Sequence, residues 1–220
     1  DRYLDQSIVE YASWMDRYRN SPGYEHTTSH HMVTIDTDGS LVEAERAGGK
    51  AAIALREAVD ILSHHEDYND STVFINIVYV IHLVPEVHCP GHYYFYDLGG
   101  ADEARSRDFQ KVTMGGENTS YHHVWDASVS TLNPGLNYDG YRALFDTMSP
   151  EQQKAVSDGT VEDWILDVAS KSHVIYDWAR PGDELGTDFL VKHRDLPEGM
   201  VAVAGYRLAR LLNDLFGGQE

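Results

Sequence analysis

The stretch STVFINIVYVIHLVPEVHCPGH, residues 71–92 of this 220-residue chain, begins as a long apolar run and ends in a cluster of histidines. Its β-branched content permits a strand, but residues 71–88 are too many for one, so we predict a buried central helix. Ser71 and Thr72 suit the N-cap of this helix. Pro85 is expected to kink the helix or to tighten its last turn.

Histidine and carboxylate pairs spaced four residues apart recur at the end of this stretch and later in the chain. The pairs are His82/Glu86, His88/His92 and His122/Asp126. Residues at this spacing project from the same face of a helix. Zn²⁺ takes about four nitrogen, oxygen or sulfur ligands, so three such pairs favour a zinc site over satisfied polar groups in a buried helix. Asp16, in WMDRYR (14–19), and the adjacent His30 and His31 are further candidates.

Composition narrows the classes of function. The chain has 17 Lys and Arg against 36 Asp and Glu, a net charge of −19. No basic stripe exists to coat duplex nucleic acid or to bind an anionic membrane surface. The single cysteine, Cys89, excludes an intrachain disulfide. Its thiol could in principle ligate zinc, but we favour a buried spectator thiol. No segment is long and apolar enough to span a membrane, and the N-terminal DRYLDQ does not resemble a signal peptide.

The remainder of the chain predicts a mainly α-helical single domain over residues 1–220. Further helices are expected at 3–20, 41–64, 150–179 and 198–216, from apolar spacing and from the helix start SPEQQK. Residues 93–120 are expected to form a small irregular or hairpin segment.

The ordered motifs resemble the zinc-dependent single-strand-specific nuclease family, which includes mung bean nuclease and the fungal 3′-nucleotidase/nucleases and shares the helical phospholipase C/nuclease fold. The resemblance is carried by WMDRYR (14–19), HH (30–31), HLVPEVHCPGH (82–92), DLGG (97–100) and GGENTSYHHVWD (115–126). The closing AGYRLARLLNDLF (204–216) is similar to the family's final helix. The similarity therefore extends through nearly the whole chain.

The resemblance implies two zinc sites in this chain. One zinc would be held by Asp16, His31 and His82, and the second by His92, His122 and Asp126. His31 is preferred to His30 because it has the family's spacing from Asp16. Glu86 stands where the family has a bridging aspartate, and we assign it to the metal ligands and the catalytic residues.

Arg19 matches a basic residue that contacts phosphate in the family, so it is expected to be both a catalytic and a substrate-binding residue. Zinc would activate a water molecule for attack on the phosphorus atom. Tyr93, in the aromatic run 93–96, could offer a stacking surface to an unpaired base; burial in the core is the alternative.

This chain departs from the family pattern in several places. The family begins about 30 residues earlier, with a tryptophan and a nearby histidine that complete a third zinc site, so two zinc ions are expected here. Glu86 replaces the aspartate and lengthens its side chain by one methylene, and Pro85 replaces a glycine. Thr34 occupies the position of the family's base-reading aspartate, and Asp36 is out of register.

The predicted function is a zinc-dependent phosphodiesterase that hydrolyses single-stranded DNA or RNA, and 3′-nucleotides, to 5′-phosphate products. We expect no stable membrane association and no protein partner. The resemblance implies a secreted or periplasmic enzyme. A zinc phospholipase C is one alternative, although Asp126 favours a nuclease because the phospholipase pattern has glutamate there. A catalytically impaired metal-binding or scaffold protein is the other.

Overall fold

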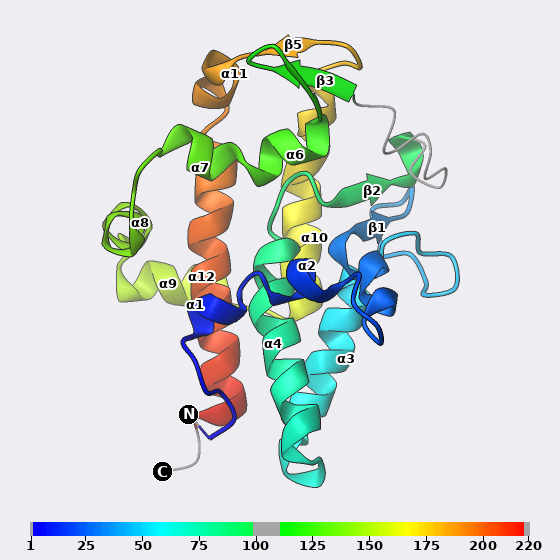
Figure 1. Cartoon of the computed structure of the whole chain (residues 1–220), viewed down its shortest axis with the longest axis vertical. Helices are drawn as coiled ribbons and strands as arrows, with labels where there is room; N and C mark the ends of the chain where they lie inside the picture. The colour runs from blue at the N-terminus through cyan, green and yellow to red at the C-terminus, as the bar shows by residue number, and fades with distance from the viewer. Residues whose placement is uncertain (1, 99–110, 218–220) are drawn as a thin grey trace.

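The computed structural model describes residues 2–98 and 111–217. Long helices run lengthwise through the molecule, as Figure 1 shows, and the labelled strands lie in its upper half, with β3 and β5 at the top. The α-helices are α1 (Ile8–Tyr11), α2 (Trp14–Tyr18), α3 (Ala51–Ser63), α4 (Asp70–Glu86), α6 (Tyr121–Asp126), α7 (Ser128–Leu132), α8 (Tyr138–Phe145), α9 (Pro150–Ser157), α10 (Val161–Ser172), α11 (Thr187–Lys192) and α12 (Asp195–Phe216). The mainly α-helical class is thus confirmed. No described helix is long and apolar enough to cross a bilayer.

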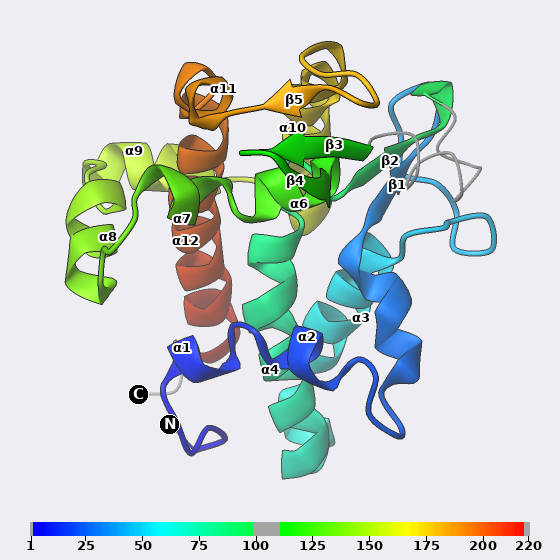
Figure 2. The same ribbon diagram turned by 45° about the horizontal axis from the view of Figure 1, so that its top comes forward.

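The remaining elements are short. The 3₁₀ helices are η1 (Glu25–His31), η2 (His65–Asp67), η3 (Tyr96–Leu98) and η4 (His173–Asp177), and the strands are β1 (Val33–Ile35), β2 (Tyr93–Phe95), β3 (Lys111–Met114), β4 (Glu117–Ser120) and β5 (Glu184–Leu185). β1 and β2 pair in parallel, and β3 lies between antiparallel β4 and parallel β5. The tilted view of Figure 2 shows the β3–β4–β5 sheet next to α6.

Helix α4 confirms the predicted central helix. It begins one residue before the predicted stretch, because the side chain of Asn69, rather than Ser71 or Thr72, accepts a hydrogen bond from the Thr72 N–H at 2.9 Å. Its buried residues pack mainly against α3 and α12. Pro85 lies inside the helix, and the chain tightens directly after it through the turn bond from His88 N to the Pro85 carbonyl at 3.0 Å. The expected tightening at Pro85 is therefore present, and it shapes the segment that carries the candidate ligands.

Three predicted helices have different bounds in the structure. Residues 3–20 form two short helices, α1 and α2, separated at Ala12 and Ser13. Residues 150–179 divide between α9 and α10, because Gly159 has a positive φ of 88° and Thr160 starts a new capping box with Asp163. The last predicted helix, 198–216, begins earlier, at Asp195.

The helix predicted at 41–64 starts only at Ala51. Before it, Leu41 and Lys50 form isolated antiparallel bridges with Ile35 and Val33 of β1. Gly49 explains the difference, because a Cβ atom at this position would lie 2.5 Å from the Cβ of Met32. Thr34 fixes the contact, since its hydroxyl donates to the Gly49 carbonyl at 3.1 Å and accepts from the Gly49 N–H at 2.8 Å. The position that would read a base in the family thus holds a structural threonine.

The expected hairpin within 93–120 is β3–β4. Its two-residue turn is Gly115-Gly116, with φ of 60° and 86°, as hairpin turns of the primed types require. Gly99 and Gly100 of the DLGG motif lie outside the described residues.

A buried arginine joins four elements behind the predicted ligands. Arg207 of α12 donates to Nε2 of His88 at 2.9 Å, to Oδ2 of Asp167 in α10 at 3.0 Å and to the carbonyl of Val156 in α9 at 2.9 Å. His88 Nδ1 donates to the Val84 carbonyl at 2.7 Å. Because Nε2 accepts from Arg207, the imidazole is neutral. Burial, aided by the Arg207 charge, lowers the pKa of His88 to about 4. The network fixes the turn between Glu86 and His92.

We expect Arg207→Met to lower the free energy of unfolding by about 3 kcal/mol, because it removes the donor to a buried imidazole and the partner of a carboxylate. Urea denaturation of metal-free protein measures this change. Arg56→Met is the matched control, since Arg56 forms only an exposed ion pair with Glu162 and should change stability by less than about 0.5 kcal/mol. Equal effects of the two substitutions would contradict a structural role for the buried network.

Candidate metal centre

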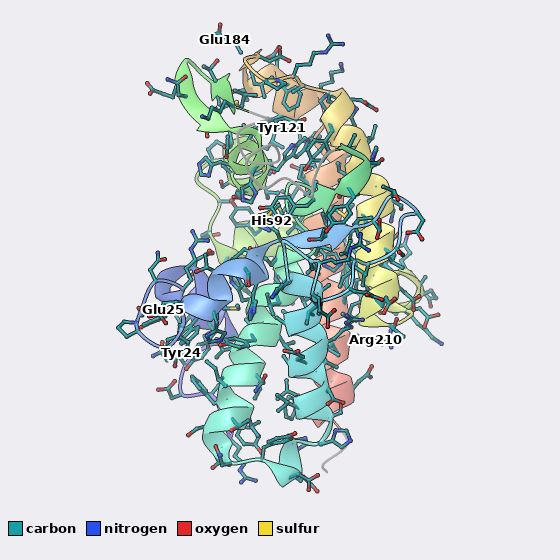
Figure 3. The ribbon with its side chains drawn as sticks, turned by 90° about the vertical axis from the view of Figure 1, so that its right-hand side faces the viewer. Tyr24, Glu25, His92, Tyr121, Glu184 and Arg210 are labelled. Atoms are coloured by element: carbon teal, nitrogen blue, oxygen red, sulfur yellow. The ribbon has the colours of Figure 1, made fainter. Side chains whose placement is uncertain are left out.

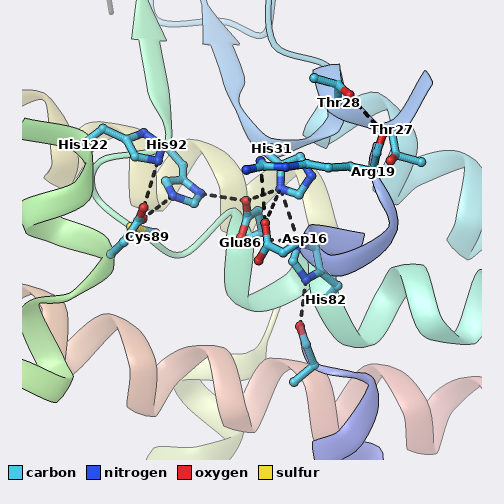
Figure 4. A network of polar contacts seen from close by, with 12 residues as sticks. Asp16, Arg19, Thr27, Thr28, His31, His82, Glu86, Cys89, His92 and His122 are labelled. Carbon is cyan, nitrogen blue, oxygen red and sulfur yellow. Dashed lines mark hydrogen bonds and ion pairs between the residues drawn. The ribbon is translucent and has the colours of Figure 1, made fainter. Parts of the chain in front are cut away.

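The predicted ligands lie together where the C-terminal end of α4 meets α2, η1 and α6. Figure 3 shows His92 near the middle of the molecule, below Tyr121 of α6. Figure 4 shows the polar contacts running from His122 and His92 through Glu86 to His31 and His82. Segments separated by more than 100 residues thus contribute to one cluster.

Asp16, His31 and His82 form the first group. One ligand atom from each lies within 4.8 Å of the others. His31 Nδ1 is 3.6 Å from Asp16 Oδ1 and 3.5 Å from His82 Nε2. The other nitrogen of His82 donates to the Ala12 carbonyl at 2.7 Å, at the break between α1 and α2. That bond fixes the tautomer and leaves Nε2 of His82 facing the group as an acceptor.

Glu86 lies between the two halves of the cluster. Its Oε1 is 2.8 Å from His31 Nδ1 and 3.2 Å from His92 Nδ1, and its Oε2 is 3.6 Å from His82 Nε2. The carboxylate therefore reaches both sides from the last residue of α4, and the longer glutamate side chain spans the distance.

The second group contains His92, His122 and Asp126. Asp126 Oδ1 is 2.6 Å from His92 Nε2, and its Oδ2 is 3.0 Å from His122 Nε2. The two imidazoles stack, with ring centroids 4.5 Å apart and an interplanar angle of 13°. Ser120 caps α6 by accepting from the His123 N–H, which sets the i,i+4 register of His122 and Asp126.

The site carries strong local fields. Burial alone would raise the pKa of Glu86, but His92, His31 and His82 outweigh it and hold the pKa well below its usual range. Burial likewise opposes ionisation of Asp126, yet hydrogen bonds from His122 and His92 keep its pKa low. Both carboxylates are therefore ionised and able to act as ligands.

The donor set fits divalent zinc. Imidazole and carboxylate ligands from four elements converge, and the buried Nδ1 of His92, beside Glu86, has no well-directed hydrogen bond within residues 2–98 and 111–217. The groups border a cleft of about 1070 Å³ that extends to Thr28, Tyr94 and Val201. A cleft of this size accommodates a nucleotide.

Arg19 lies at the rim of the same cleft. Its Nη1 is 3.7 Å from Asp16 Oδ1, and the side chain is 41% exposed, so the guanidinium is accessible to a ligand in the cleft. Its neighbour Arg17 instead donates to the Glu10 carbonyl. Of Arg17 in α2 and Arg19 directly after it, Arg19 is thus the one placed to meet an anionic group.

The structure separates the remaining candidates. His30 is not in the first group, and its ring packs edge-on against His26 with centroids 5.7 Å apart. Tyr93 is fully buried and its hydroxyl donates to the Val87 carbonyl at 2.6 Å. The expectation that Tyr93 stacks on a base is therefore wrong, because its ring belongs to the core. Asp36 pairs with Arg46 at 3.4 Å and does not line the cleft.

Cys89 lies beside the second group, although the sequence favoured a spectator thiol over a zinc ligand at this position. Its Sγ lies 3.4 Å from Asp126 Oδ1, and Cys89, His92 and Asp126 offer ligand atoms within 4.8 Å of one another. Burial raises the pKa of the Cys89 thiol. The Cys-x-x-His spacing of residues 89–92 could have indicated this position.

Comparison with known proteins agrees with the motifs. The family model of the S1/P1 nucleases matches residues 2–217. Nuclease S1 of Aspergillus oryzae is 22% identical over 239 residues, which cover 96% of this chain and 80% of the fungal protein. The resemblance to single-strand-specific nucleases is confirmed at the level of the family, and this chain belongs to the S1/P1 nuclease family of phosphodiester hydrolases.

Proposed function

We propose that this protein is a zinc-dependent nuclease that cleaves single-stranded nucleic acid, and 3′-nucleotides, to products with 5′-phosphates. The observation that carries the proposal is the convergence of two histidine–carboxylate groups on either side of Glu86 in one cleft. Export from the cytoplasm is part of the proposal and follows from the family resemblance.

The proposed ligands divide between two zinc ions. Asp16, His31 and His82 would hold one ion, His92, His122 and Asp126 the other, with Glu86 between them. Bound zinc supplies an activated water and stabilises negative charge on phosphate.

The protein's own residues supply positioning. His82 is oriented by the Ala12 carbonyl, and Asp126 holds His92 and His122 at a fixed separation. Arg19 reaches the phosphate from the rim and stabilises the charge that develops as the bond to the leaving oxygen breaks. The preference for single strands over a duplex is part of the proposal and follows from the family resemblance.

The purified protein is expected to contain about two zinc ions and to cleave a single-stranded oligonucleotide faster than the matching duplex. A chelator should abolish cleavage and added Zn²⁺ should restore it. Elemental analysis measures the zinc content, and the cleavage rates of the single strand and the duplex measure the preference. End-group analysis of the products checks for the 5′-phosphate. Hydrolysis of phosphatidylcholine with no cleavage of DNA would instead support a phospholipase C, and bound zinc without turnover would support a scaffold protein.

Arg19→Ala is expected to reduce kcat on single-stranded DNA about 100-fold while zinc content stays unchanged, because the guanidinium acts on the transition state. Arg17→Ala, two residues away on α2, is the matched control and should keep near-normal activity. Parallel loss of zinc and activity in Arg19→Ala would make the arginine a structural partner of Asp16.

The register of α6 separates His122 from His123. Adjacent helical residues point about 100° apart, and His122 contacts Asp126. We therefore expect His122→Ala to remove one zinc equivalent and most activity, whereas His123→Ala keeps both. Elemental analysis of the two variants decides the point, and the reverse pattern would contradict the assigned register.

A further inference from the structure

The turn that follows α4 carries a thiol into the second group. We propose that Cys89 is an additional protein ligand of the metal ion bound by His92, His122 and Asp126. This inference rests on the proposed function, since it requires a metal ion in that group. It extends the family-derived ligand set by a residue that the sequence reasoning treated as a spectator.

The distances suit one shared ion. Sγ of Cys89 lies 3.4 Å from Asp126 Oδ1, and the ligand atoms of Cys89, His92 and Asp126 are all within 4.8 Å of one another. Zn–S bonds of about 2.3 Å and Zn–N bonds of about 2.0 Å place neighbouring tetrahedral donors roughly 3.5 Å apart. Side-chain adjustments of less than an ångström or so would therefore bring the thiol into the shell.

The backbone of the turn supports this placement. Cys89 N donates to the Glu86 carbonyl at 3.2 Å, and His92 N donates to the Cys89 carbonyl at 3.1 Å, so consecutive tight turns direct both side chains. Gly91 lets this turn press against α6, because a Cβ atom there would lie 3.0 Å from the Trp125 Cβ and 3.2 Å from the His122 carbonyl oxygen. The turn is thus packed directly against the helix that supplies the other ligands.

A second observation within the group also points to a bound cation. His92 is buried, 6% exposed, and its Nδ1, 3.2 Å from Glu86 Oε1, has no well-directed hydrogen bond within the described part of the chain. Three anionic or potentially anionic groups, from Cys89, Asp126 and Glu86, surround this imidazole. A divalent cation would balance them. On binding, the Cys89 S–H bond is lost, the proton passes to water and the sulfur donates its electron pair to the metal.

The shared ion would tie two segments together, because Cys89 and His92 lie on the turn after α4 and Asp126 lies on α6. Cys89 would thus anchor the turn to the helix that supplies the other ligands.

Cobalt(II) provides a direct test, because a thiolate ligand gives an intense near-ultraviolet sulfur-to-cobalt charge-transfer band and Cys89 is the single cysteine of the chain. The metal-free full-length protein is titrated with Co²⁺ while absorbance is recorded and bound metal is measured by equilibrium dialysis. We expect one equivalent of bound Co²⁺ to produce the band. Cys89→Ser and Cys89→Ala should lose the band and keep visible d–d absorption.

The outcomes are distinguishable. Two bound Co²⁺ ions with no charge-transfer band in the unmodified protein would overturn the role of Cys89 and leave the proposed metal centre in place. A protein that binds no Co²⁺ would overturn both. Persistence of the band in Cys89→Ser would also contradict the proposal. The spectrum of the unmodified protein decides the matter even if a substitution impairs folding, because no other cysteine can contribute.

Discussion

The Glu86 carboxylate is the contact on which the whole site depends. It stands on the last residue of the buried helix α4 and lies within 3.2 Å of both His31 and His92, which belong to different halves of the cluster. A buried carboxylate costs several kcal/mol unless it is paired, so the surrounding imidazoles and Glu86 require one another. The helix end, the 3₁₀ segment η1 and the turn before β2 are held together by this requirement, and the cleft forms between them.

The rigidity behind Glu86 comes from a separate set of bonds. His88 is buried and is held by Arg207, which also binds elements α9 and α10. Alternate side chains of one short turn therefore serve different purposes: Glu86 and His92 face the cleft and His88 is fixed to the core. Loss of the Arg207 network would act on the ligands indirectly, through the position of the turn.

Sequence reasoning reached the parts of this structure that depend on local periodicity and motif spacing. The apolar run at 71–88 predicted α4, because its signal is local. The glycine pair at 115–116 lies in the segment predicted to be irregular or a hairpin, and it forms the turn of β3–β4. The helix predicted at 41–64 was too long. The backbone of Gly49 packs against Met32, and this tertiary contact is not encoded in the local pattern around Gly49. The same limit explains Tyr93 and Cys89: burial of one and the approach of the other to Asp126 depend on tertiary packing that spacing does not encode.

The negative charge of this protein opposes the binding of a polyanion such as nucleic acid, and the proposed metal ions would offset that charge in the cleft. The chain carries a net charge of −19, and the carboxylates of Asp16, Glu86 and Asp126 line the cleft. Two divalent ions would bring four positive charges against these three carboxylates, which makes the cleft attractive to phosphate. A Cys89 thiolate would remove that small excess, and the four charges would then balance. With these ligands, Arg19 at the rim supplies the remaining positive charge of the cleft. The cleft can therefore bind phosphate as well as metal because of Arg19.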